Sequence, residues 1–107
     1  MTDAAGRSIK KLLVARRDAA QADFIAAVHD YDRQARIVDD LDRALCEADV
    51  NLENSAGPSV QTKHRRYLLA TRFSETARLE AVRTRRDAAR AALEEALSAK
   101  ISFELLG

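Results

Sequence analysis

The segment Asn54-Ser55-Ala56-Gly57-Pro58-Ser59 is the feature that most constrains the fold of this chain. A glycine readily takes the left-handed conformation that ends a helix. A proline cannot continue a helix from inside, but its fixed φ suits the first position of a new helix. The segment therefore predicts the end of one helix and the start of the next. Because the connection is short, we expect the second helix to run antiparallel to the first.

The stretches on either side of this turn are almost free of helix breakers. Apart from Gly6, no glycine or proline occurs between Asp3 and Glu53, and none occurs between Val60 and Leu106. We therefore predict an all-α chain, a long antiparallel two-helix coiled-coil hairpin. This single domain, residues 1–107, would have a first arm at 3–53, a turn at 54–59 and a second arm at 60–106. Thr2 or Asp3 is expected to cap the first helix.

The composition favours a narrow hydrophobic seam over a thick core. Apolar residues make up 47% of the chain, but aromatic residues make up only 5%, and much of the apolar share is alanine. Charged residues make up 33% and nearly balance, with a net charge of +1. A balance of this kind implies no general attraction to nucleic acid or to an anionic membrane.

Cysteine usage and hydropathy give an expected compartment. Cys46 is the only cysteine, so the chain forms no internal disulfide and a reducing compartment is expected. No run of about 18 apolar residues is present, and the N-terminus lacks the apolar centre of a signal peptide. We expect a cytoplasmic protein that is not inserted in a membrane.

The first arm carries a regular coiled-coil heptad. Apolar or small residues recur at alternating steps of four and three, at Ala20, Phe24, Ala27, Tyr31, Gln34, Val38, Leu41, Leu45, Ala48 and Leu52. One column of this pattern is bulky and the other is mostly small, so a second helix can approach closely. Ile9, Leu12 and Leu13 are expected to extend the apolar face towards the N-terminus. The pattern predicts a packing seam.

The second arm has a less regular apolar pattern. On a wheel at 100° per residue, the side expected to face the first arm holds His64, Leu68, Leu79, Val82, Ala89, Leu93 and Leu97. Leu69 and Phe73 do not join this side, since Phe73 lies roughly 120° from Leu79 on the same wheel. We therefore expect Leu69 and Phe73 to face water, a second copy or a partner. The alternative is a local roll of the helix that buries Phe73.

The two arms carry opposite charges near the turn. Residues 30–53 are rich in aspartate and glutamate, and residues 61–90 are rich in arginine and lysine. At the outer ends the signs reverse, with Lys10, Lys11, Arg16 and Arg17 expected to meet Glu94, Glu95 and Glu104. Each exposed pair contributes little alone. Together the pairs favour this antiparallel register over slipped or parallel ones.

No motif in the sequence indicates catalysis, a metal site or a cofactor. His29 and His64 are not level in the folded arms, Cys46 has no His at zinc spacing, and there is no glycine-rich phosphate loop. The run Arg83-Thr84-Arg85-Arg86 lacks interleaved aromatic residues for base stacking, and an acidic arm lies opposite. We predict a non-enzymatic protein with no cofactor, no metal and no nucleic-acid partner.

The order of these features resembles the FliJ/YscO family of type III secretion and flagellar export. The similar pieces are the start Leu12-Leu13-x-x-Arg16-Arg17, the heptad arm, the turn Ser55-Ala56-Gly57 and the apolar pair Leu69 and Phe73. The run Ala96…Lys100…Glu104-Leu105-Leu106 is similar to the end of the family's second arm. The resemblance covers almost the whole chain and implies a coiled-coil stalk.

The resemblance also implies two contacts. The paired ends would enter the pore of a hexameric export ATPase, through Leu12, Leu13, Arg16, Arg17, Leu105 and Leu106. The second arm near the turn would contact the export-gate protein through Leu69, Phe73, Thr76 and Glu80, of which Thr76 and Glu80 match the family in position but not in residue type. The family positions on the first arm fall at Gln34, Val38, Leu41 and Leu45, which we assign to packing first because they coincide with the seam.

Other functions fit the same sequence pattern. One is a self-associating structural hairpin, in which two copies form an antiparallel four-helix bundle with Leu69 and Phe73 inside. Another is a helical adaptor for a different partner. The stalk hypothesis predicts a monomer, whereas the structural hypothesis requires a dimer.

Overall fold

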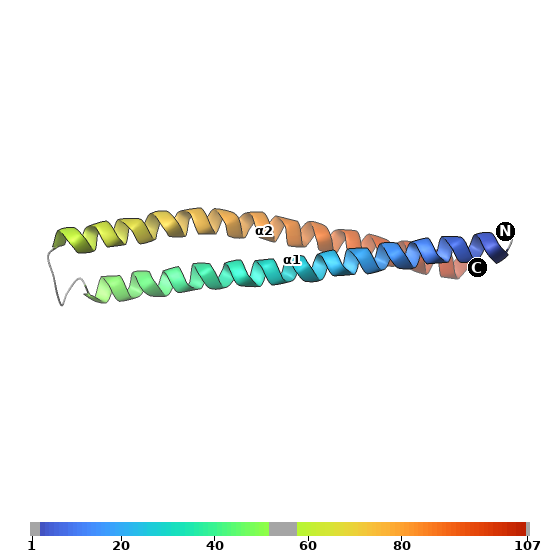
Figure 1. Ribbon diagram of the computed structural model, residues 1–107, viewed down its shortest axis with the longest axis horizontal. Coiled ribbons are helices and arrows are strands. Elements are labelled where there is room, and N and C mark those ends of the chain that lie inside the picture. The colour runs from blue at the N-terminus through green and yellow to red at the C-terminus, as the bar shows by residue number, and fades with distance from the viewer. Residues whose placement is uncertain (1–2, 52–57, 107) are drawn as a thin grey trace. The chain divides into compact units, whose positions relative to one another are not determined.

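Two long helices account for the residues that the structure describes, 3–51 and 58–106. In this computed structural model, α1 spans Asp3–Asn51 and α2 spans Pro58–Leu106, and each helix has 49 residues (Figure 1). Proline as the first residue of α2 fits its fixed φ and its missing N–H. The expected cap Thr2, the seam residue Leu52 and most of the expected turn, 54–57, lie outside the described residues.

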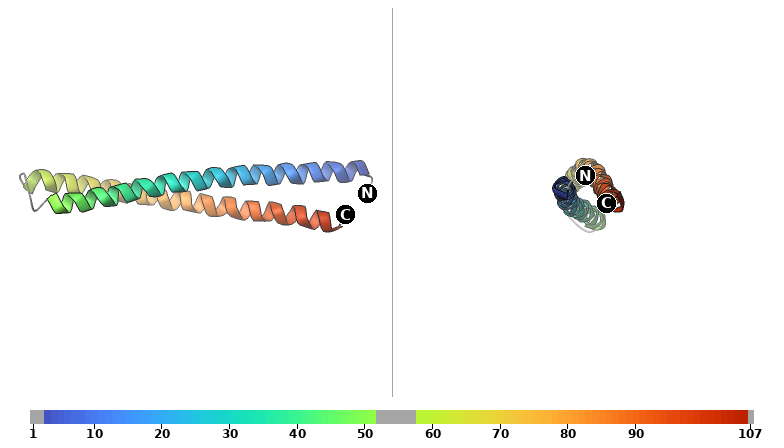
Figure 2. Two further views of the ribbon diagram at one scale, coloured as in Figure 1. Left: turned by 90° about the horizontal axis from the view of Figure 1, so that it is seen from below. Right: turned by 90° about the vertical axis from the view of Figure 1, so that its right-hand side faces the viewer.

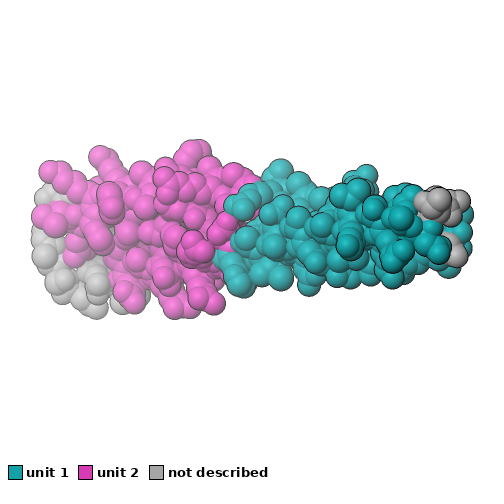
Figure 3. All heavy atoms as spheres, turned by 45° about the vertical axis from the view of Figure 1, so that its right-hand side comes forward, with its two compact units in different colours: residues 1–29, 84–107 teal, residues 30–83 magenta. Residues whose placement is uncertain are grey.

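Contacts divide the chain into two compact units (Figure 3). Unit 1 comprises residues 1–29 and 84–107, and unit 2 comprises residues 30–83. Within each unit, a stretch of α1 lies antiparallel beside a stretch of α2 (Figure 2). The predicted fold class, an all-α two-helix coiled-coil hairpin, is thereby confirmed.

The heptad predicted for the first arm forms the seam of α1. Ala27 and Val38 are buried, with exposed fractions of 1% and 8%. The other predicted positions within the described residues are half-buried, namely Ala20, Phe24, Tyr31, Gln34, Leu41, Leu45 and Ala48. The assignment of Gln34, Leu41 and Leu45 to packing is therefore correct.

The seam of α2 also follows a heptad. Two columns with a period of seven are buried or half-buried, at 61, 68, 75, 82, 89, 96 and 103, and at 72, 79, 86, 93 and 100. The predicted seam positions Leu68, Leu79, Val82, Ala89 and Leu93 belong to these columns. The repeat keeps its register along α2, as coiled coils do.

Three seam predictions were wrong, at His64, Leu97 and Leu12. His64 is exposed, Leu97 is 39% exposed and Leu12 is 70% exposed. A straight helix at 100° per residue drifts by about 20° per heptad from a repeat of 3.5, so the wheel misplaced the residues at both ends of the second arm. On α1, Leu13 is half-buried and takes the seam position, which leaves its neighbour Leu12 outside.

The seam contains many polar residues and few fully buried ones. Arg72, Glu75, Arg86 and Lys100 occupy seam positions of α2. Among the described residues, the buried hydrophobic ones are Ala27, Val38, Leu68 and Ala96, of which two are alanines. Because buried apolar area supplies most of the stability of a helix pair, we expect the two helices to bind each other only weakly.

Charged pairs connect the two helices as the charge pattern predicts. In unit 2, Arg65 Nε lies 2.9 Å from Asp49 Oδ1, and Arg72 Nε bonds Asp42 Oδ1. In unit 1, Arg16 Nη2 lies 3.9 Å from Glu95 Oε2. The expected contacts of the other outer residues differ, because Glu94 and Glu104 pair with Arg90 and Lys100 on their own helix and Arg17 pairs with Asp18.

Candidate partner-binding surface

Leu69 and Phe73 form an exposed apolar patch on α2 in unit 2, here named the Leu69–Phe73 patch. They are four residues apart, so their side chains are neighbours on the helix surface. Phe73 is 79% exposed and Leu69 is 42% exposed, whereas the adjacent Leu68 is 6% exposed. The heptad explains the difference, since Leu68 occupies the seam and the next residue turns away from it. The alternative in which the helix rolls to bury Phe73 does not occur.

Two cross-helix contacts hold α2 where it carries this patch. Arg65 pairs with Asp49 one turn before Leu69, and Arg72 pairs with Asp42 immediately before Phe73. A third contact follows, in which the Gln34 side-chain amide donates to the main-chain carbonyl of Glu75 at 3.0 Å. The helix surface that carries the patch is thereby fixed on α1 by polar contacts on both sides.

The other two residues expected at this surface differ from each other. Glu80 is exposed, and its carboxylate lies 3.8 Å from Arg83 Nη1. Thr76 is half-buried, and its hydroxyl oxygen is buried without a hydrogen-bond partner among the described residues. Leu69, Phe73 and Glu80 are therefore accessible to a partner, whereas the Thr76 hydroxyl is not.

The residues expected to contact an ATPase lie where α1 begins and α2 ends, in unit 1. The beginning of α1 and the end of α2 lie at the same end of that unit (Figure 2). Leu12, Leu105 and Leu106 are strongly exposed, at 70%, 83% and 88%. Arg16 is exposed and pairs with Glu95, whereas Leu13 and Arg17 are half-buried at the seam.

Two exposed features of α2 were missed by the reasoning from sequence. Tyr67 is 67% exposed in unit 2. In unit 1, Leu97 and Ile101 are 39% and 54% exposed and again four residues apart. The heptad of α2, extended through Ala96 at the seam, would have placed Leu97 outside.

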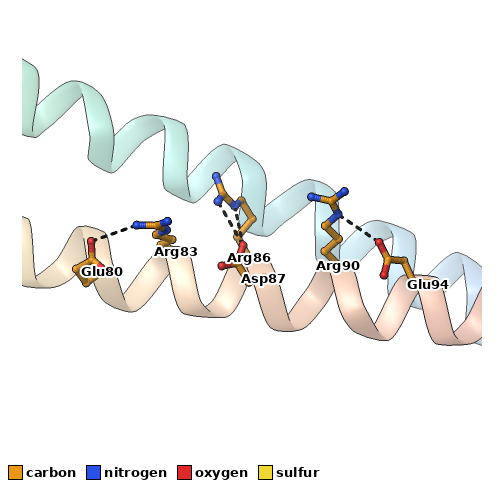
Figure 4. A network of polar contacts seen from close by, with 6 residues as sticks. All are labelled: Glu80, Arg83, Arg86, Asp87, Arg90 and Glu94. Atoms are coloured by element: carbon orange, nitrogen blue, oxygen red, sulfur yellow. Dashed lines mark hydrogen bonds and ion pairs between the residues drawn. The ribbon is translucent and has the colours of Figure 1, made fainter.

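The basic run at 83–86 is largely paired with carboxylates. Arg83 pairs with Glu80, and Arg86 Nη2 lies 3.3 Å from Asp87 Oδ1 (Figure 4). Arg86 is also half-buried at the seam. Further along α2, Arg90 pairs with Glu94 at 3.3 Å (Figure 4). This part of the α2 surface therefore carries alternating positive and negative side chains that pair with one another.

No group of three or more His, Cys, Asp or Glu side chains in residues 3–51 and 58–106 is arranged to hold a metal ion. Neither described helix has a segment long and apolar enough to cross a membrane. Cys46 is a free and exposed thiol on α1.

Comparison of the chain with protein-family models, curated proteins and solved structures gave no significant match.

Proposed function

We propose that this protein is a non-enzymatic coiled-coil adaptor that binds another protein through the Leu69–Phe73 patch. Its setting would be a type III, flagellar-type export apparatus, where it would couple the hexameric export ATPase to the export gate. The observation that supports partner binding is the exposure of Phe73, an aromatic side chain that is 79% exposed beside a buried Leu68. The resemblance to the stalk family supports the setting.

The patch is large enough to anchor a complex. Burying an exposed leucine or phenylalanine contributes roughly 1.5–3 kcal/mol. Because Leu69 is only 42% exposed and Phe73 79% exposed, covering both would contribute on the order of 2–4 kcal/mol, which corresponds to an affinity gain of about 30- to 1,000-fold. An aromatic side chain buried at the centre of an interface can act as the anchor of a complex, and Phe73 is the candidate here.

The weak seam also favours a role in an assembly. Within the described residues, the core holds only two buried side chains larger than alanine, Val38 and Leu68. A partner that covers the helices would stabilise them by mass action. A hairpin of this kind is suited to packing against a larger protein.

The exposed ends in unit 1 support the ATPase contact. Leu12, Leu105 and Leu106 occupy the positions that the resemblance assigns to the ATPase pore, and all three are exposed. They lie far along the sequence from Leu69 and Phe73. Two partners could therefore bind separate residues of the same chain.

The test uses two double variants and two partners from the organism that encodes this chain. The first variant, Leu69→Ala with Phe73→Ala, should lose capture of the cytoplasmic domain of the export gate and keep capture of the export ATPase. The second, Leu105→Ala with Leu106→Ala, should do the reverse, so each variant is the control for the other. Undiminished capture of the export gate by the first variant would refute the assignment of the patch.

A further inference from the structure

A row of exposed residues runs along one side of α2, beside the seam. The α2 outer stripe consists of Arg66, Leu69, Phe73, Thr76, Glu80, Arg83, Asp87, Arg90, Glu94, Leu97, Ile101 and Glu104. Its members alternate at steps of three and four, immediately beside the seam columns. Every member except Thr76 is exposed. The stripe has an apolar pair near each end and charges between them.

The two apolar pairs are related by the heptad. Leu69 and Phe73 in unit 2 recur as Leu97 and Ile101 in unit 1, four heptads further along α2. All four side chains are at least 39% exposed. Two patches with the same spacing can meet when a second copy of α2 is laid against the first.

From this pattern we infer that the α2 outer stripe binds a second copy of the same stripe in the antiparallel direction. When the twofold axis passes between Arg83 and Asp87, each residue meets the residue at the mirrored position of the other copy. The apolar pairs then match, with Leu69 opposite Ile101 and Phe73 opposite Leu97.

The charges of the stripe are complementary in the same alignment. Glu80 meets Arg90 of the second copy, and Arg83 meets Asp87 of the second copy. At the outer edge Arg66 meets Glu104 of the second copy. Thr76 opposite Glu94 is the one position without an apolar or ionic match.

Other alignments of the two stripes do not pair apolar residues with apolar residues and opposite charges with each other. A parallel pair would set Arg83 against Arg83 and Glu80 against Glu80 of the second copy, and like charges in contact are unfavourable. An antiparallel pair shifted by one heptad would set Phe73 against Glu104 or Arg90 of the second copy. The stripe thus specifies both the direction and the register of the dimer.

The charges already form pairs within one copy, but these pairs are exposed. The pairs Glu80–Arg83 and Arg90–Glu94 have separations of 3.8 Å and 3.3 Å on solvent-exposed side chains (Figure 4). Exposed pairs of this kind contribute little each, so rearranging them against a second copy costs little. The apolar pairs provide affinity, and the charges select the alignment.

This inference goes beyond the proposed function and does not depend on it. The dimer covers Leu69 and Phe73, which are the residues proposed to bind the export gate. Self-association and partner binding therefore compete for the same patch. The dimer would be the form of the free protein, and the monomer that the stalk hypothesis predicts would be the form bound to the export gate.

The decisive experiment uses two charge-reversal variants of the stripe, one acidic and one basic. Arg83→Glu with Arg90→Glu gives an acidic stripe, and Glu80→Arg with Asp87→Arg gives a basic stripe. Sedimentation velocity should show a wild-type dimer of twice the 11.9 kDa chain mass, a monomer for each variant alone, and a dimer again for their equimolar mixture. Only complementary stripes on two different chains would produce that recovery.

The control changes the same number of charges away from the stripe. Arg36→Glu with Lys63→Glu alters two exposed residues outside it and should leave the dimer intact. Circular dichroism shows whether each variant stays helical. If a charge variant loses helicity, the neutral variant Leu97→Ala with Ile101→Ala replaces it and should be monomeric.

Two outcomes would overturn the inference. One is a wild-type chain that remains monomeric well above micromolar concentration. The other is a wild-type dimer that persists in the acidic or basic variant, or helical variants that fail to associate when mixed. The acidic variant keeps Leu69 and Phe73, so its capture of the export gate tests the proposed function independently of the dimer.

Discussion

The side-chain amide of Gln34 on α1 donates a hydrogen bond to the main-chain carbonyl of Glu75 on α2 at 3.0 Å. The same amide also bonds the Glu75 carboxylate, and the Glu75 side chain is only 15% exposed. Both residues occupy seam positions in unit 2, Gln34 four residues before Val38 on α1 and Glu75 one heptad after Leu68 on α2. A polar layer of this kind fixes the register of a coiled coil at a cost in stability.

Replacing this polar layer should therefore stabilise the protein. We expect the double variant Gln34→Leu with Glu75→Leu to unfold at higher urea concentration than the wild type, with a free energy of unfolding higher by about 1–3 kcal/mol. Gln34→Ala alone should destabilise, because the half-buried Glu75 loses the hydrogen bonds to its carbonyl and carboxylate from Gln34 and keeps only the carboxylate bond from Arg78 Nη1 at 3.1 Å among the described residues. A double variant less stable than the wild type would show that the layer contributes net stability.

Adjacent leucines on α2 provide a matched test of the seam. Leu68 is 6% exposed and Leu69 is 42% exposed. Leu68→Ala should lower the free energy of unfolding by roughly 2–5 kcal/mol, because it opens a cavity at the seam. Leu69→Ala, measured at low protein concentration, should change it much less. Equal losses in urea denaturation would mean that the seam has been placed on the wrong side of α2.

Gly6 is a position where α1 can be improved. It lies inside α1, and a Cβ added there would meet no atom within 4 Å. Gly6→Ala should raise the free energy of unfolding by up to about 1 kcal/mol, since alanine loses less backbone entropy in a helix. The melting temperature should rise by a few degrees, and Ala4→Gly should lower it. A lower melting temperature for Gly6→Ala would contradict the helical assignment of this turn.

Much of this fold could be predicted from the sequence, because the heptad spacing shows which residues of a helix pack against a second helix. The steps from Ala20 to Ala48 place one face of α1 at the seam. The opposite charges of residues 30–53 and 61–90 predict that these segments lie side by side, and the pairs Asp49–Arg65 and Asp42–Arg72 agree with that prediction. The second arm is harder to predict, because Arg72, Glu75 and Arg86 occupy seam positions that a search for apolar residues passes over.

The candidate surface was predictable only in part. The helical wheel correctly predicts that Leu69 and Phe73 lie outside the seam. They are close in sequence to the seam positions Leu68 and Leu79, so little error accumulates between them on the wheel. It fails at Leu97, since the drift between a straight helix and a heptad accumulates over several turns. The identity of a partner cannot be read from an exposed apolar pair alone, because leucine and phenylalanine fit many protein surfaces.

The central claim is that Phe73 is free of the seam and available to a partner. The chain contains no tryptophan, so Phe73→Trp introduces a single fluorescent reporter at this position. Lys63→Trp, at an exposed residue outside the α2 outer stripe, is the matched control. Both proteins are measured at a dilution at which the chain is monomeric.

Acrylamide quenching and emission wavelength, recorded with and without the cytoplasmic domain of the export gate, give the most direct test. In the free chain, the Phe73→Trp indole should emit as a water-exposed group and be readily quenched. Adding the export-gate domain should shift its emission to shorter wavelength and protect it, with no change for Lys63→Trp. A Phe73→Trp indole that is already shielded in the dilute free chain, or that does not respond to the export-gate domain, would contradict the account.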